Sequence, residues 1–270
     1  MESGPGGAVD IAGRRFAWRA VGQGPPLLLV NGYAATGADW DPAFLDGLGA
    51  SFEVLCPDNR GVGDSELGDG ALTIDGMAAD LAVLIDALGI ERLPVVGWSM
   101  GGFVAQRLAE RAPRRVAVLA LLATDPGGPE SVPAAPETWD RLTDHSGTPR
   151  EQATRLISLL FPSELAIDID RQFGEVVAAG RAGLSPALLT AQEAAMEAWH
   201  RDSRPGLEAE GISVLVAHGS LDVVIPPGNA EVLAARFPGA TVEIFDGCGH
   251  GLMAQQPQPL VELIVGRAGG

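Results

Sequence analysis

The chain contains no lysine. All 18 of its basic side chains are arginines, against 35 aspartates and glutamates, and the formal net charge is −17. Binding to nucleic acid or to anionic lipid depends on clustered positive charge, which this balance disfavours. We therefore expect neither nucleic acid nor a membrane among the partners, and we interpret the acidic charge as a solvated surface.

Long apolar runs and a cysteine framework are missing as well. No stretch approaches the ~18 uninterrupted apolar residues of a membrane helix, and the N-terminus lacks the basic-then-apolar order of a signal peptide. Cys56 and Cys248, the two cysteines, are expected to be free thiols in a reducing cytosol. These observations predict a cytoplasmic protein, with Cys248 a small buried side chain.

Short apolar segments bounded by turn residues alternate with segments of helical spacing. This alternation predicts an α/β fold, in which helices cover both faces of a mostly parallel sheet of eight strands. The predicted helices of this core are 73–88, 103–112, 228–237 and 257–265. The predicted strands are 8–12, 15–21, 27–30, 52–57, 93–97, 116–123, 213–217 and 241–245.

The alternation is interrupted between residues 127 and 205. Pro126-Gly127-Gly128-Pro129 opens this stretch, which has no convincing strand pattern up to Pro205. We therefore predict one core, residues 1–126 and 206–270, with a helical insertion at 127–205 after its sixth strand. The helices predicted within it are 137–144, 150–160, 168–182 and 186–201.

Ser99 lies at the centre of a Gly-x-Ser-x-Gly pattern, between a predicted buried strand and a predicted helix. A sharp strand-to-helix turn of this kind exposes the serine hydroxyl above the sheet. The helix N-terminus beneath it favours developing negative charge. The alternative is that the segment is a glycine-rich turn with no catalytic role. The position of Ser99 between a strand and a helix favours a nucleophile.

A serine nucleophile needs a base, and the chain has four histidines. His145 and His200 fall in the insertion, where we expect surface histidines. His218 ends a strand and is expected to pack or hydrogen-bond beneath the site. His250 lies in a glycine-rich loop after the last strand, from which an imidazole reaches over the carboxyl edge of the sheet. We therefore predict His250 as the base.

The base needs an acid to fix its tautomer, and two aspartates follow strands. Asp222 comes directly after the penultimate strand, which gives the chain order Ser99, Asp222, His250 expected for this kind of site. Asp125 ends the strand after the nucleophile helix and is the alternative. Pro126 behind it favours a role in shaping the entry into the insertion, so we predict Asp222.

Two backbone N–H groups are predicted to hold the oxyanion. One belongs to Met100, directly after the nucleophile, and the other comes from the loop after strand 27–30, where we choose Tyr33. Tyr33 is the only tyrosine, and its ring is expected either to contact substrate or to pack. This chemistry requires no cofactor and no metal.

Together these motifs resemble the α/β-hydrolase superfamily, in its esterase, lactonase and haloperoxidase-like serine-hydrolase branch. The resemblance spans nearly the whole chain. Dehalogenases and epoxide hydrolases resemble this layout but carry aspartate where this chain has Ser99, and Asn31-Gly32 departs from the family's more usual His-Gly. The motifs are Asn31-Gly32-Tyr33, Asp58-Asn59-Arg60-Gly61-Val62-Gly63-Asp64-Ser65, Gly97-Trp98-Ser99-Met100-Gly101-Gly102, and the loops of Asp222 and His250. We interpret the second motif as a structural turn organised by its arginine.

The resemblance also implies that the insertion is a cap over the active site. Most apolar side chains of such a cap belong to its own core, and a few face substrate. The residues that we expect to contact substrate are Asn31, Trp98, Trp139, Phe161 and Trp199.

The implied activity is hydrolysis of an ester or lactone of a small, fairly apolar substrate through an acyl-enzyme. Cofactor-free haloperoxidase or perhydrolase chemistry and C–C bond hydrolysis would use the same triad. A non-catalytic ligand-binding protein on this scaffold is the alternative from another class. Degenerate members usually lose the serine, the acid or the histidine, and all three are present here. The sequence leaves the oligomeric state open, a homo-oligomer included.

Overall fold

Eight strands form one sheet in the computed structural model, which describes residues 6–202 and 211–268. Their order across the sheet is β1-β2-β4-β3-β5-β6-β7-β8. β3 to β8 run parallel, and β1 and β2 form an antiparallel edge. The predicted α/β fold class is confirmed. The strands are β1 (Gly6–Ile11), β2 (Arg14–Val21), β3 (Pro26–Val30), β4 (Glu53–Pro57), β5 (Leu93–Trp98), β6 (Val116–Leu122), β7 (Ser213–Gly219) and β8 (Thr241–Phe245).

Helices cover both faces of this sheet, so the central strands are apolar on both sides. In β3, Leu28 and Val30 belong to one hydrophobic cluster, and Leu27 and Leu29 belong to the other. The first cluster is closed by α2 (Ile74–Ala87), α3 (Met100–Arg111) and α8 (Asn229–Arg236). The second is closed by α1 (Pro42–Gly49), α9 (Leu252–Gln255) and α10 (Pro257–Ala268).

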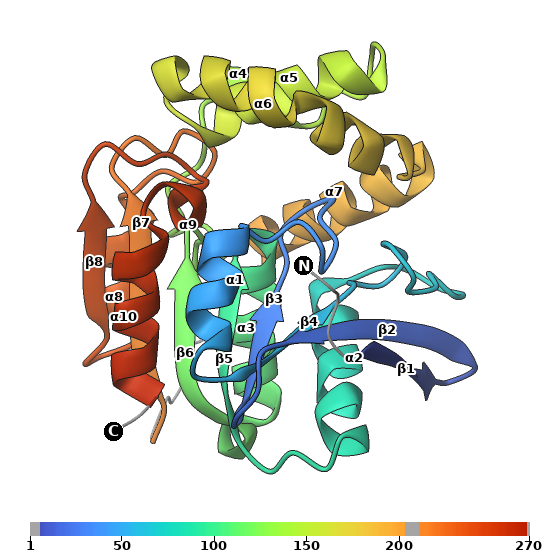
Figure 1. Ribbon diagram of the computed structural model, residues 1–270, viewed down its shortest axis with the longest axis vertical. Helices are drawn as coiled ribbons and strands as arrows, with labels where there is room; N and C mark the ends of the chain where they lie inside the picture. Colours follow the sequence, from blue (N-terminus) through green and yellow to red (C-terminus); the bar gives the residue numbers. More distant parts are fainter. Residues whose placement is uncertain (1–5, 203–210, 269–270) are drawn as a thin grey trace.

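Among the residues that the structure describes, four further helices lie between β6 and β7, and we call them the cap: α4 (Pro136–Leu142), α5 (Pro149–Leu160), α6 (Ser163–Ala182) and α7 (Pro186–Arg201). Figure 1 shows α4, α5 and α6 as a layer above the carboxyl ends of the parallel strands, with α7 leading back to the core. The predicted end of the insertion at Pro205 lies outside the described residues. Within the described ranges, no helix is both long and apolar enough to cross a membrane.

The helix α1 is absent from the sequence-based prediction. Asp41 caps it by accepting a hydrogen bond from the Phe44 N–H at 2.9 Å, and Pro42 occupies its first turn. An aspartate followed by proline is a recognised helix start. The helix has only eight residues, so its three buried apolar side chains make too short a pattern to stand out from a loop.

The segment from Asp58 to Ser65 ties loops together, in keeping with its structural interpretation. The Asp58 carboxylate accepts hydrogen bonds from the Gly37 N–H at 2.7 Å and the Asp64 N–H at 3.0 Å. Arg60 donates two hydrogen bonds of 2.8 Å to the buried Asp80 of α2. The side chains of Asp58 and Arg60 are therefore used within the fold.

Candidate active site

Ser99 occupies the sharp turn between β5 and α3. Its backbone is held at φ 55° and ψ −125°, a strained conformation for a residue with a side chain. The Ser99 N–H donates to the Leu122 carbonyl at 3.0 Å, and the Ser99 carbonyl accepts from the Gly102 N–H at 2.8 Å. A Cβ atom on Gly101 would collide with the Val30 carbonyl oxygen. Glycine is therefore required there, because α3 begins directly against β3.

Asp222 and His250 form a buried hydrogen-bonded pair. Asp222 Oδ2 lies 2.8 Å from His250 Nδ1, and the two side chains are almost fully buried. The other carboxylate oxygen accepts from the Val224 and Ile225 N–H groups, each at 2.9 Å. An Nδ1–H donated to Asp222 leaves His250 Nε2 unprotonated, so that this nitrogen is a proton acceptor.

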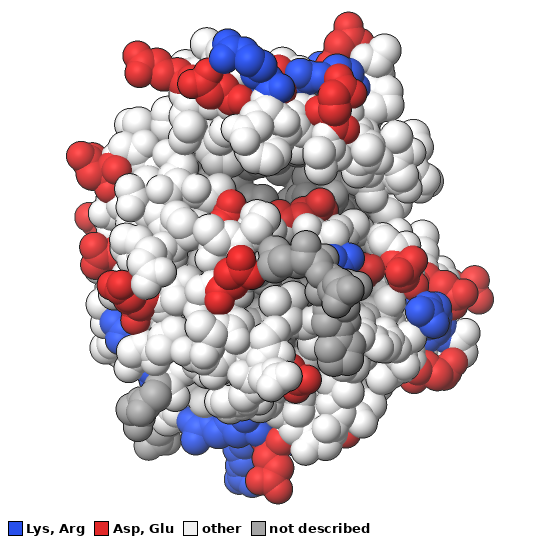
Figure 2. Space-filling model, viewed as in Figure 1, with Lys and Arg blue, Asp and Glu red and all other residues white. Residues whose placement is uncertain are grey.

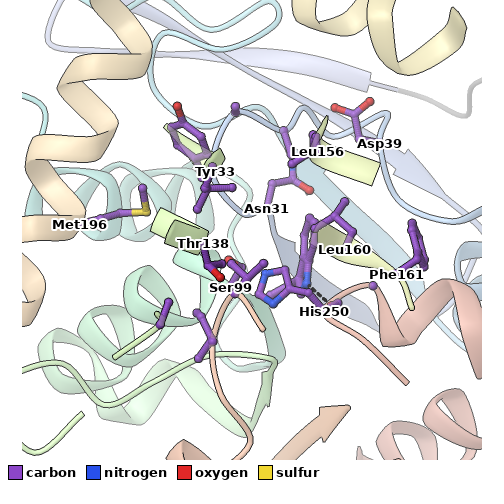
Figure 3. Close-up of a pocket in the computed structure, with 18 of the residues that line it drawn as sticks. Asn31, Tyr33, Asp39, Ser99, Thr138, Leu156, Leu160, Phe161, Met196 and His250 are labelled. Atoms are coloured by element: carbon purple, nitrogen blue, oxygen red, sulfur yellow. Dashed lines mark hydrogen bonds between the residues drawn. The ribbon is translucent and has the colours of Figure 1, made fainter. Parts of the chain in front are cut away.

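Ser99 and His250 line the same cavity, and Figure 3 shows them next to each other. Trp98 holds His250 in place: its Nε1–H donates to the His250 carbonyl at 3.0 Å, and the two ring centroids are 5.4 Å apart. The structure therefore brings the predicted nucleophile and base together, with Asp222 behind the base.

His218 and Thr124 support the turn from beneath. The Thr124 hydroxyl donates to the Ser99 carbonyl at 2.8 Å, and His218 Nε2 lies 2.9 Å from the Thr124 carbonyl. Burial lowers the pKa of His218, which keeps the ring neutral, so that Nε2 carries the donated proton. His218 therefore hydrogen-bonds beneath the site, as its position at the end of a strand predicts.

Asp125, the alternative acid, binds the end of α7 instead of His250. Its Oδ1 accepts from the Gly127 N–H at 2.8 Å and from Trp199 Nε1–H at 3.0 Å. Its Oδ2 lies 2.9 Å from His200 Nε2. Asp125 thus joins the cap to the core, and the structure separates it from the Asp222–His250 pair.

The expectation that His145 and His200 are surface histidines holds in part, since their side chains are 24% and 39% exposed. Both side chains are partly buried, and each faces a carboxylate: Asp125 for His200, and Glu193 at 2.8 Å for His145. Burial opposes the charged form of His200, but the hydrogen bond and charge of Asp125 outweigh it and raise the pKa of His200. His200 also lines the cavity. Helical spacing within the insertion could not reveal these partners, because they lie on other elements.

The loop after β3 passes directly beside Ser99. A Cβ on Gly32 would lie 3.2 Å from Ser99 Cβ, and Tyr33 lines the cavity. Met100 is the first residue of α3, so its N–H has no acceptor within the helix. The two residues predicted to bind the oxyanion therefore flank Ser99. The Ala34 N–H donates to Gln192 Oε1 at 2.9 Å, which fixes this loop to α7.

A cavity of about 1270 Å³ lies between the cap and the core. Figure 2 shows its opening as a hollow beneath the cap helices, with acidic side chains at its lower edge. Ser99 and His250 form part of its floor, and most of its wall is apolar. The cap contributes Trp139, Leu156, Leu160, Phe161, Phe173 and Met196.

Of the residues expected to contact substrate, Asn31, Trp98, Trp139 and Phe161 line the cavity. The Asn31 amide points into the protein, because its Nδ2–H donates to the Pro57 carbonyl at 3.1 Å.

The expectation that Trp199 contacts substrate is wrong. Its side chain is fully buried, it stacks on Phe103 with ring centroids 5.0 Å apart, and it donates to Asp125. Helical spacing indicates that a side chain is buried but not which surface it is buried against. The sequence analysis also missed Arg181, a cap residue that lines the cavity, since no local pattern marked it.

Neither thiol competes with Ser99 as a nucleophile. Burial raises the pKa of Cys56 to about 12, and burial together with Asp246 raises the pKa of Cys248, so both stay protonated near neutral pH. In the part of the chain that the structure describes, no group of three histidine, cysteine or acidic side chains is arranged to hold a metal ion.

Residues 25–257 match the model of a protein family described as the alpha/beta hydrolase fold. A non-heme chloroperoxidase from Streptomyces lividans is 28% identical over 88% of this chain and 89% of its own length. A thermophilic esterase from Thermogutta terrifontis is 28% identical, with a TM-score of 0.75 over 97% of each chain. A meta-cleavage product hydrolase from Pseudomonas fluorescens IP01 superimposes with a TM-score of 0.83 over 97% of each chain; at 19% identity this likeness concerns the fold alone.

Proposed function

The chain belongs to the alpha/beta hydrolase fold family and is a hydrolase, and from this premise we propose that it cleaves ester or lactone bonds through an acyl-enzyme on Ser99. One observation carries the proposal. The strained turn of Ser99 and the acceptor nitrogen of the His250–Asp222 pair meet in one apolar cavity.

The first half-reaction acylates Ser99. His250 Nε2 takes the proton of the Ser99 hydroxyl while Oγ attacks the substrate carbonyl carbon, and the carbonyl electron pair moves onto oxygen. The N–H groups of Met100 and Tyr33 bind this oxyanion. Asp222 stabilises the imidazolium, which then gives its proton to the departing alkoxide as the C–O bond breaks.

The second half-reaction releases the acid. Water loses a proton to His250 Nε2 and attacks the acyl carbon, and the proton returns to Ser99 Oγ when the tetrahedral intermediate collapses. Every proton in this sequence is carried by His250, so neither a cofactor nor a metal takes part. A small-molecule substrate is the only partner that the reaction needs.

A second candidate differs only in the acceptor. The name of the Streptomyces lividans relative favours testing hydrogen peroxide in place of water at the acyl-enzyme. The product would then be a peracid, formed from the same acyl-Ser99.

The proposal is tested by measuring turnover of a panel of phenyl esters and lactones, with and without hydrogen peroxide. We expect the wild-type protein to release phenol from esters, and Ser99→Ala to lose about 10⁴-fold or more in kcat. Ser158→Ala, at an exposed serine of α5, serves as the matched control and keeps wild-type turnover. A folded wild-type protein that turns over no ester and no lactone would contradict the proposal.

A further inference from the structure

Arg181 is a buried cation in the wall of the cavity. It lies in the last turn of α6, and only 8% of the residue is exposed. Among the described residues, no carboxylate oxygen lies within 4.0 Å of its guanidinium nitrogens, and its Nε has no hydrogen-bond partner. Buried arginines are almost always paired, because an uncompensated charge is costly away from water. The missing counter-charge at this position points to a ligand.

The side chains around Arg181 do not neutralise it. Glu193 is the nearby acid, but its Oε1 accepts the Tyr33 hydroxyl at 2.5 Å and lies 2.8 Å from His145 Nε2. Burial and Glu193 raise the pKa of Tyr33, although the charge of Arg181 and its hydrogen bond to the Tyr33 hydroxyl oxygen act in the opposite direction. Tyr33 therefore remains a neutral hydroxyl next to Arg181. Among the described residues, no carboxylate therefore forms an ion pair with the guanidinium group.

Tyr33 also sets the distance between Arg181 and the reacting centre. Its backbone belongs to the loop that passes beside Ser99, and its hydroxyl end lies against Arg181. Figure 3 shows the Tyr33 hydroxyl pointing away from Ser99. The backbone of Tyr33 thus lies next to the residue beside Ser99 and its hydroxyl lies beside Arg181, so that Ser99 and Arg181 are near opposite ends of this side chain. Arg201, which also lines the cavity, is exposed to solvent, so water weakens its attraction for an anion.

We propose that Arg181 binds a carboxylate of the substrate, and that the preferred substrates are esters or lactones of acids that carry a second, ionised carboxyl group. An apolar segment about as long as a tyrosine side chain separates that group from the scissile carbonyl. This assignment rests on the proposed serine-hydrolase function. A single guanidinium balances a single negative charge and pairs with a carboxylate in a planar, two-pronged geometry. The overall charge of −17 opposes a dianion such as a phosphate monoester.

The test compares phenyl hemiesters of succinic, adipic and suberic acid with the neutral phenyl esters of butanoic, hexanoic and octanoic acid. We expect Arg181→Gln to lower kcat/KM for the best hemiester by about 10- to 100-fold, mainly through KM, and to change the matched neutral ester by less than about 3-fold. Arg171→Gln, on the exposed side of the same helix, is the matched control and changes neither. Equal effects of Arg181→Gln on both esters, or no effect on either, would overturn the assignment.

Measuring the binding of a hemiester that is not turned over tests the role of Arg181 separately from the proposed hydrolase function. Calorimetric titration of the phenyl hemiester into Ser99→Ala, and into Ser99→Ala with Arg181→Gln, measures the anion contact alone. We expect affinity to fall about 10-fold or more in the double variant, and Arg181→Lys to restore part of it. Equal affinities contradict the role of Arg181 even if esters are hydrolysed. Wild-type protein that turns over no ester, while hemiester binding still depends on Arg181, would contradict the hydrolase function instead.

Discussion

At the scale of single residues, two aspartates that follow neighbouring strands do different work. Asp222, after β7, is bound to His250 and to two backbone N–H groups. Asp125, after β6, is bound to Trp199 and His200 at the end of α7. The first orients a side chain at the cavity floor, and the second attaches the cap.

Replacing each aspartate by asparagine separates these roles. In Asp222→Asn the carboxylate that holds the proton on His250 Nδ1 is replaced by an amide, which favours the wrong tautomer of His250. We expect kcat for ester hydrolysis to fall by about 10⁴-fold with little change in melting temperature. Asp125→Asn removes a charged acceptor from α7, and we expect kcat to stay within about 10-fold of wild type while stability falls by about 1–3 kcal/mol. Steady-state kinetics and denaturant unfolding of both variants measure this. The reverse pattern would reassign the acid.

Ser99, Asp222 and His250 could be predicted because each follows a strand, and parallel strands bring their carboxyl ends to one edge. The cap residues could not be predicted in the same way. Trp199 and Arg181 lie on helices with apolar side chains on more than one side, and chain spacing does not say which side meets the cavity. Their surroundings depend on how the cap packs onto the core.

At the scale of elements, α7 connects the cap to the catalytic loops. Gln192 accepts from the Ala34 N–H, Glu193 accepts from the Tyr33 hydroxyl, and His200 lies against Asp125. The loop that flanks Ser99 is therefore held from two elements, β3 and α7. A change in how α7 docks will alter the position of the oxyanion-binding loop.

The His200–Asp125 pair makes this docking pH-dependent. The pKa of His200 is raised above its usual value of 6.5, so its stabilising effect is fully present below that value and is lost as pH rises through the higher folded pKa. We expect the stability difference between wild type and His200→Gln to be larger at about pH 6 than at about pH 9. His218 titrates in both proteins and cancels from the comparison. Denaturant unfolding at several pH values measures the difference, and a gap that widens with rising pH would contradict the assignment.

The contact between α3 and β3 gives a second prediction for an element. Gly101→Ala places a methyl group against the Val30 carbonyl oxygen, and we expect the free energy of unfolding to fall by about 3 kcal/mol or more, because the atoms in the way belong to the backbone and not to a flexible side chain. Gly266→Ala, in α10, meets no atom within 4 Å and serves as the control. There we expect a gain of about 0.5–1 kcal/mol from helix propensity. Thermal unfolding of both variants measures these changes in stability. A Gly101→Ala variant as stable as the wild type would contradict the packing described.

At the scale of the whole molecule, an acidic chain encloses a cavity whose wall contains the buried cation Arg181. The net charge of −17 repels an anionic substrate in solution, whereas Arg181 attracts it only once it is inside. Salt screens exposed charges much more than buried ones. The net charge of the chain therefore repels an anionic ester at long range, whereas Arg181 attracts it at short range. Added salt weakens the first effect more than the second.

Ionic strength separates them. Between about 10 and 150 mM NaCl, we expect kcat/KM of the wild type to rise several-fold for the phenyl hemiester of suberic acid and to stay level for phenyl octanoate. The reason is that screening removes repulsion at the surface and leaves the contact at Arg181. Initial rates at low substrate concentration measure both, and a fall in the hemiester rate with added salt would contradict this description of the charge.

The central claim is that Ser99 is the nucleophile, and reaction with a fluorophosphonate probe tests it most directly. Intact-mass spectrometry should show one adduct on the wild-type protein, peptide mapping should locate it at Ser99, and His250→Ala should react far more slowly. Folded wild-type protein that stays unlabelled while a control esterase reacts, or an adduct on another serine, would contradict the account.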